Sequence, residues 1–240
     1  MFWFSRLAAV LMFMGGATIG VLAESSYLEK SDQAFIPRTC RYDLTVFVDK
    51  NGVERTYSFK GLKKGSEENL LLTRSPKSSY GIAHLRRGGS IWTYYPTIGQ
   101  SYRVSYQALF LNSVLNYGDI LSTQLDRDYD IQKMEINRSS TIGVVVLTLV
   151  PRPQTQGYAK IVLRIDEKTF LPISRDYYAF SGMVIKKMVF TIDRTRESPI
   201  YIQEFEEPLK QTKTTVKYSN IQSSEVDSSV FNPSSIPYLR

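Results

Sequence analysis

GIAHLRRGGSIWTYYP, residues 81–96, contains two runs of strand-forming residues joined by a turn at 87–89. In a strand, Trp92 and Tyr94 point to one face of the sheet, whereas Ile91 points to the other. Large apolar side chains therefore occupy both faces, although a sheet with one face in water would show polar residues there. We expect both faces of this hairpin to be covered, the second one either by helices or by a ligand.

The same pattern continues through most of the chain, where runs rich in β-branched and aromatic residues alternate with turn signals. The predicted strands are 41–48, 53–62, 68–74, 81–87, 90–96, 129–138, 141–150, 158–166, 171–180, 183–193 and 214–221. Between the first two, DKNG at 49–52 predicts a hairpin with Asn-Gly at its tip. Short connections of this kind predict a meandering antiparallel sheet in a single, mainly β domain over residues 24–240.

One stretch departs from the strand pattern. VSYQALFLNSVLNYGDILSTQL, residues 104–125, has Leu109, Tyr117 and Leu121 near helical spacing and predicts one or two short helices, mainly over 106–122. A further short helix is predicted at 25–35, before the first strand. These helices are available to cover one face of the sheet.

The N-terminus has the layout of a secretory signal peptide. Arg6 is the only charged residue before Glu24, an apolar run begins at Leu7, and short residues precede a cleavage position after Ala23. The alternative is a retained membrane anchor, but glycines between 15 and 20 weaken a run that would need about 20 apolar residues. We predict a signal peptide over 1–23 and export across the inner membrane.

Charge alone leaves two kinds of anionic partner open. The formal net charge is +7, which favours phospholipid headgroups or nucleic acid. Arg86 and Arg87 lie near Trp92 in sequence, as in a stacking site for bases, but they belong to the turn and are expected to be solvated. The lysines at 186, 187, 210, 213 and 217 are spread over the C-terminal strands rather than clustered. With export in addition, we predict no nucleic-acid partner.

Residues for catalysis are scarce. His84 is the only histidine, which excludes a multi-histidine metal site, and it is expected to be a partly exposed strand residue. The acidic run 126–130 is similar to the start of a calcium loop, yet Ile131 stands where that loop requires glycine, and a solvated strand face is the expectation. Cys40, the only cysteine, cannot form an intramolecular disulfide and is expected to be buried. We predict that the protein is not an enzyme and uses no metal or cofactor.

The order of several motifs resembles the outer-membrane lipoprotein-sorting protein family, the LolA-like group, over about residues 41–239. The residues that carry the resemblance are Pro76, Gly81, Leu85, Trp92, Tyr94 and Pro96, then NSVLNYGDI at 112–120, and Phe231 near the end of the chain. Asn112 and Val114 replace the glycine and aspartate usual in the family's second motif. The resemblance implies an unclosed antiparallel β-barrel, a half-barrel, with short helices packed in its concave face. It also implies a periplasmic monomer whose apolar hollow takes up acyl chains of lipoproteins or lipids, with an inner-membrane export complex as a further partner.

The candidate ligand-binding residues combine this implication with the strand pattern. Trp92 and Tyr94 are expected on the concave side because the bulkier pair of the strand needs the deeper burial. The residues expected to lie over them are Leu109, Phe110, Val114 and Leu115, and the residues expected to extend the same wall are Leu70, Leu72 and Ile82. The alternative is that all nine form a dry, permanently closed core. A carrier is the predicted function, and an envelope sensor or scaffold that binds lipid or lipoprotein without ferrying it is the alternative.

Overall fold

The computed structural model describes residues 27–122, 125–139, 141–153, 155–195, 197–210 and 212–239. The predicted signal peptide and its cleavage site lie outside these ranges. Within them, no helix has the length and apolar character needed to cross a membrane.

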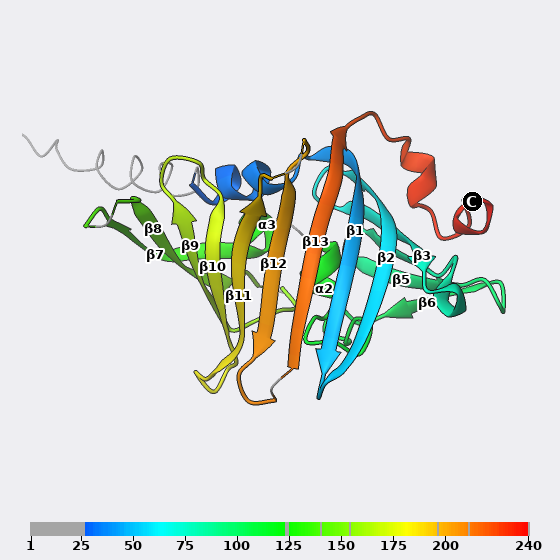
Figure 1. The fold of residues 1–240 in the computed structure, drawn as a ribbon, viewed down its shortest axis with the longest axis horizontal. Helices are drawn as coiled ribbons and strands as arrows, with labels where there is room; N and C mark the ends of the chain where they lie inside the picture. Colours follow the sequence, from blue (N-terminus) through cyan, green and yellow to red (C-terminus); the bar gives the residue numbers. More distant parts are fainter. Residues whose placement is uncertain are drawn as a thin grey trace, which may run out of the picture.

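The described strands form one antiparallel sheet, as predicted, and Figure 1 shows their arrangement. Their order across the sheet is β6-β5-β4-β3-β2-β1-β13-β12-β11-β10-β9-β8-β7. In chain order the strands are β1 (Thr39–Lys50), β2 (Val53–Lys64), β3 (Glu68–Ser75), β4 (Ala83–Arg87), β5 (Ser90–Tyr95), β6 (Gln100–Val104), β7 (Tyr129–Asn137), β8 (Val144–Pro151), β9 (Lys160–Asp166), β10 (Pro172–Tyr178), β11 (Val184–Asp193), β12 (Ile200–Glu207) and β13 (Thr212–Ser223).

The two edge strands, β6 and β7, follow each other in the chain but lie at opposite edges of the sheet. The sheet therefore does not close, which confirms the predicted half-barrel. The chain between these edges has to cross the sheet, and the described residues of this crossing, 105–122 and 125–128, include α2 (Tyr117–Leu121) and α3 (Leu125–Asp128). Figure 1 shows α2 behind the central strands β13 and β1.

One face of the sheet, called the inner face below, is covered by this crossing segment and by a helix over 27–35. On β1, alternate residues Tyr42, Leu44 and Val46 are buried in a core that also contains Leu28 and Phe35 of that helix. The N-terminal helix predicted at 25–35 is thus confirmed over its described residues. Because both covers pack against alternate residues of many strands, the inner face contains the main hydrophobic core.

The opposite face, called the outer face, has a smaller cover near one edge. The C-terminal segment contains the short 3-10 helices η2 (Ser228–Phe231) and η3 (Ile236–Tyr238) and packs against β3, β4 and β5. A second hydrophobic cluster forms there, in which Leu70, Leu85 and Tyr94 contact Phe231 and Ile236. Figure 1 shows this segment, coloured red, leaving β13 and reaching the side of the sheet where β3 and β5 lie. A further 3-10 helix, η1 (Lys77–Ser79), follows β3.

The structure corrects the element predictions in three places. Strands β6 and β12 were not predicted, although IYIQEFEE of β12 has the alternation of a strand. The helix predicted mainly over 106–122 is confined to 117–121, with α3 after it. The predicted Asn-Gly hairpin is confirmed, since Asn51 and Gly52 have φ values of 55° and 78°, as a type I′ turn requires.

Candidate functional site

Three of the predicted site residues lie together in the core of the inner face. Phe110, Val114 and Leu115 are buried there, with Phe110 and Leu115 entirely inaccessible. Leu109 is 60% exposed, so its predicted place over the wall of the hollow is wrong in this conformation. Ile82, just before β4, is half-buried and belongs to neither cluster of the described residues.

Four other predicted residues lie on the outer face. Trp92, Tyr94, Leu70 and Leu72 belong to the cluster under the C-terminal segment or pack against it. The expectation that Trp92 and Tyr94 face the concave side is wrong, and Ile91 points into the inner core instead. The bulkier pair is buried as expected, but its cover is the C-terminal segment. Whether any of these residues binds a ligand stays a prediction.

The residues predicted to be helical form an irregular hairpin. Gly118 N–H donates to Tyr106 O at 3.0 Å, Tyr117 N–H donates to Ala108 O at 3.0 Å, and a third hydrogen bond joins the strands of the hairpin nearer its tip. Leu111, at the tip, has a φ of 56°, which a helix does not allow. We call residues 105–121, which comprise this hairpin and α2, the lid.

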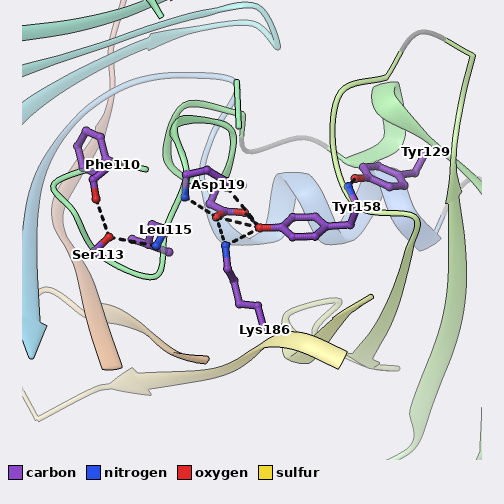
Figure 2. A network of polar contacts seen from close by, with 8 residues as sticks. Phe110, Ser113, Leu115, Asp119, Tyr129, Tyr158 and Lys186 are labelled. Atoms are coloured by element: carbon purple, nitrogen blue, oxygen red, sulfur yellow. Dashed lines mark hydrogen bonds and ion pairs between the residues drawn. The ribbon is translucent and has the colours of Figure 1, made fainter. Parts of the chain in front are cut away.

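The tip of the lid is fixed by its own hydrogen bonds. Phe110 N–H donates to Leu115 O at 2.8 Å. Ser113 Oγ donates to Phe110 O at 2.7 Å and accepts from Leu115 N–H at 3.0 Å, as Figure 2 shows. Asn112 also has a positive φ, 53°, a conformation that Asn tolerates better than most residues. The lid is therefore a preformed cap that lies on the inner face without joining the ladder of the sheet.

A buried ion pair connects the lid to the sheet. Asp119 of α2 accepts a hydrogen bond from Lys186 Nζ of β11 at 2.5 Å, and both side chains are at most 7% exposed. Tyr158, before β9, donates to Asp119 Oδ1 at 2.9 Å and accepts from Lys186 Nζ at 2.5 Å. Figure 2 shows the three side chains converging on one point. We call Asp119, Tyr158 and Lys186 the latch.

The Asp119 carboxylate and the Lys186 ammonium group of the latch are both buried and paired with each other. Asn116 N–H, at the start of α2, donates to Asp119 Oδ2 at 2.9 Å, so the carboxylate has partners on several sides. Burial first, and then the negative charge of Asp119, raise the pKa of Tyr158 well above its usual value, which keeps its hydroxyl protonated as a donor. A paired buried charge is tolerated, but either charge left alone would be costly.

Two neutral contacts connect other parts of the lid to the sheet. Thr93 Oγ1 of β5 donates to Tyr117 Oη at 3.0 Å. Asn69 Nδ2 of β3 donates to Leu121 O at the end of α2 at 3.3 Å, and its Oδ1 accepts from Tyr42 Oη at 2.8 Å. The lid is thus attached to the sheet by side chains rather than by backbone ladders.

The inner face also contains an aliphatic region. Alternate residues of β8 and β9 point inward, and Leu147, Leu149, Leu163 and Ile165 are all inaccessible. The ring contacts of the lid lie elsewhere on this face, where Phe110 packs against Phe59 of β2 and His84 of β4.

Several polar residues lie deeper than predicted. His84 is 4% exposed rather than partly exposed, and burial lowers its pKa to about 3. Arg86 is buried at the end of β4, where its Nε donates to Gly88 O, rather than solvated. The acidic run 126–130 spans α3 and the start of β7, and Asp128 bonds Ser122 Oγ and Arg127 Nε instead of lying on a solvated strand face. Cys40 is buried, as predicted.

The latch was missed, although the sequence contained a signal for it. In VIKKMVF, Lys186 lies two residues before Met188 and four before Phe190, so alternation along the strand places it on the same, apolar face. Lys187 points to the opposite, outer face. A lysine on an apolar face requires a partner, and that rule indicates a buried carboxylate. Among the described residues, no group of three or more His, Cys, Asp and Glu side chains is placed to bind a metal ion.

Comparisons with known proteins agree with this architecture. A family model described as an uncharacterized protein matches residues 65–237. A search of curated protein sequences found no match. Among solved structures, a LolA superfamily protein from Nitrosomonas europaea is 23% identical with a TM-score of 0.75, over 86% of this chain and 96% of that chain.

Two further solved structures are similar over most of their length. A DUF1329 family protein from Desulfovibrio piger is 22% identical with a TM-score of 0.75, over 90% of this chain and 98% of that chain. A protein from Vibrio parahaemolyticus, described as an outer membrane lipoprotein-sorting protein domain, is 16% identical with a TM-score of 0.74, over 91% of this chain and 97% of that chain. At these identities the likeness shows that the fold is shared.

Proposed function

We propose that this protein is a periplasmic carrier that shelters acyl chains of lipids or lipoproteins on its inner face. The chain belongs to the family of uncharacterized proteins whose model matches residues 65–237, and it has the fold of the LolA superfamily. The observation that supports this proposal best is the apolar inner face, which includes the aliphatic residues of β8 and β9 and is covered in part by a lid attached to the sheet through side chains. The fold shared with the Vibrio parahaemolyticus protein, which is described as an outer membrane lipoprotein-sorting protein domain, is consistent with it.

The energetics favour long alkyl chains as the cargo. Burial of one methylene contributes about 0.8 kcal/mol, whereas association costs about 4–15 kcal/mol in lost freedom. A chain of roughly ten methylenes is therefore needed before binding is favourable. The opened inner face supplies apolar contacts for such a chain and no reactive group is required, so the proposed activity is binding and release rather than catalysis.

Opening of the lid exposes the latch to water. When α2 moves away from β11, water solvates the charges of Asp119 and Lys186 as they separate. Opening therefore costs far less free energy than leaving one of these charges buried without its partner. The equilibrium between closed and open forms then sets the apparent affinity, because a ligand that binds only the open form is weakened by the fraction that is closed. Weakening the latch should therefore tighten binding.

Binding of a palmitoylated peptide to wild type and to Lys186→Met, measured by isothermal titration calorimetry, tests this mechanism. Without its cation, Asp119 is unpaired in the closed form, and we expect the apparent affinity of the variant to rise at least about tenfold. Lys187→Met is the matched control, since it removes a neighbouring cation that is exposed, and its affinity should equal that of wild type.

Two results would contradict the proposal. One is the absence of binding by wild type and Lys186→Met when both are folded. The other is equal affinity in wild type, Lys186→Met and Lys187→Met, because the peptide would then bind without opening the lid.

A further inference from the structure

The outer face contains a cavity that the lid and the inner face do not share. It has a volume of about 610 Å³ and lies against the outer sides of β1, β2, β3 and β13, with the C-terminal segment forming one wall. This volume is within the range of about 300–1,000 Å³ that small-molecule sites have. Leu70 and Leu72, two of the predicted ligand-binding residues, line it.

The floor and one wall of the cavity are aliphatic. Leu62, Leu70 and Leu72 project from β2 and β3, and Val230 and Leu239 project from the C-terminal segment. Leu62, Val230 and Leu239 are only half-buried, so part of their apolar surface faces the open cavity. An aliphatic pocket of this shape accepts an alkyl chain better than a polar solute.

The rim of the cavity is cationic. Arg41, Lys60 and Arg74 line it, against one carboxylate, that of Asp43. Asp43 is already paired, with Lys60 Nζ at 2.6 Å and Asn220 Nδ2 at 2.8 Å.

The other two cations remain available to an anion. Arg74 Nη1 donates to the neutral hydroxyl of Tyr80 at 3.1 Å, and no carboxylate of the described residues forms an ion pair with Arg74. Arg41 is exposed, and no described residue forms an ion pair or hydrogen bond with its side chain. The rim thus has two guanidinium groups whose charges are not neutralised.

We propose that this cavity binds a fatty acid, with its alkyl chain on the leucine floor and its carboxylate at Arg41 and Arg74. A guanidinium forms paired hydrogen bonds with a carboxylate, and such charge-assisted bonds are about twice as strong as neutral ones. A single alkyl chain with a compact anionic headgroup suits a cavity of about 610 Å³ that is lined by leucines and by Arg41, Lys60 and Arg74. The site is on the opposite face from the lid, so the inference does not rest on the proposed carrier function.

Calorimetric titration with dodecanoate, below its micellar concentration and at low salt, tests the site in the full-length protein. We expect wild type to bind dodecanoate more tightly than dodecyl maltoside or dodecyltrimethylammonium, which have the same chain with a neutral or a positive headgroup. Arg41→Gln should weaken dodecanoate binding about tenfold, as loss of a charge-assisted contact does. Arg55→Gln is the matched control, because Arg55 is an exposed arginine of β2 that does not line this cavity.

Two further variants locate the bound chain. Leu62→Trp places a larger ring in the cavity and should abolish binding of dodecanoate, while circular dichroism confirms that the variant is folded. In Lys186→Met, which loosens the lid on the other face, adding Arg41→Gln should weaken dodecanoate binding by the same factor as in wild type. This result separates the cavity from the inner face, because binding to the inner face does not depend on Arg41.

The proposal would be overturned by equal affinity for the three dodecyl headgroups, by undiminished binding in folded Leu62→Trp, or by an effect of Arg41→Gln that disappears in the Lys186→Met background. Tighter binding of lysophosphatidylglycerol than of dodecanoate, lost in Arg41→Gln, would also contradict it, because the headgroup would then be a phosphodiester rather than a carboxylate.

Discussion

Lys186 is the residue whose surroundings depart most from those of an ordinary surface lysine. Its ammonium group lies over the rings of Tyr158 and Tyr177 at 5.1 and 5.8 Å and is paired with Asp119. The aliphatic part of the side chain and its ammonium group are both buried, so the contribution of Lys186 to stability depends on the presence of Asp119.

We expect Lys186→Met to lower the free energy of unfolding by about 3–5 kcal/mol, because it leaves the Asp119 carboxylate buried without a cation. The double variant Asp119→Leu/Lys186→Met should recover most of this loss, since an apolar pair of similar volume has no charge to desolvate. Urea denaturation followed by circular dichroism measures both. A single variant as stable as wild type, or a double variant less stable than the single one, would show that the latch is not a buried charge pair.

His84 gives the protein a defined pH dependence. Its folded pKa of about 3, lowered by burial, is below the usual value of 6.5. Between these values the unfolded chain binds a proton that the folded chain excludes, so stability is complete above pH 6.5 and falls as the pH drops toward 3. The slope is at most about 1.4 kcal/mol per pH unit.

His84→Phe should remove this part of the pH dependence. Phenylalanine fits the aromatic surroundings, since Phe110 and Tyr117 have ring centroids 5.0 and 5.6 Å from the imidazole. The difference in unfolding free energy between wild type and variant, measured from pH 7.5 to 4.5, should shift in favour of the variant on acidification. A difference independent of pH would mean that the pKa of His84 is the same in the folded and the unfolded protein.

At the scale of elements, the lid depends on a close contact inside its own hairpin. A Cβ at Gly118 would lie 1.9 Å from the ring of Tyr106, so Gly118→Ala must push that ring aside. We expect a loss of about 1–3 kcal/mol, typical of overpacking, together with faster amide exchange in residues 105–121. Gly89→Ala is the matched control, because a Cβ there meets no atom within 4 Å.

Hydrogen exchange measured by mass spectrometry on both variants checks this prediction. Faster exchange in Gly118→Ala that spread evenly over β8 and β9 as well as the lid would contradict it, because the lid would then not open as a separate unit.

Most strands of the sheet were predicted from the sequence, but the shape of the lid was not. Strand periodicity and turn signals act locally, so they predicted β1, β8 and the Asn-Gly hairpin. The lid has apolar residues near helical spacing, yet its shape follows from the positive φ at Leu111 and from contacts with the distant sheet.

The candidate site was predicted only in part, for a similar reason. Alternation correctly places Trp92 and Tyr94 on one face, but nothing local says which face the lid covers and which the C-terminal segment covers. Phe110, Val114 and Leu115 of the lid lie on the inner face, but not over Trp92 and Tyr94 as predicted, because that pair lies on the other face. The latch joins residues far apart in the chain, and its signal in the sequence was the position of Lys186 on the apolar face of a strand.

For the whole molecule, the order of the strands explains why a lid exists. The chain builds one half of the sheet outward from β1 to β6, crosses to β7, and builds the other half back to β13 beside β1. The crossing has to pass over a face, and the inner face is the one it covers (Figure 1). The same connection that completes the fold therefore also closes the proposed binding surface.

Export is a prediction for the whole chain. The charge, apolar run and short residues of the N-terminus predict cleavage after Ala23, so the intact mass of protein from its native cells should correspond to a chain that begins at Glu24. Recovery of the full-length chain in the membrane fraction would show that the segment is retained as an anchor.

The central claim, that the inner face receives acyl chains, is tested most directly by photo-cross-linking. A lipopeptide with a diazirine in its acyl chain is bound, irradiated and digested, and the modified peptides are identified by mass spectrometry. We predict adducts in the lid, 105–121, and in β8 and β9, increased by Lys186→Met and competed by unlabelled lipopeptide. Adducts confined to the outer face, on β3–β5 or residues 226–239, or no competed adduct at all, would contradict the claim.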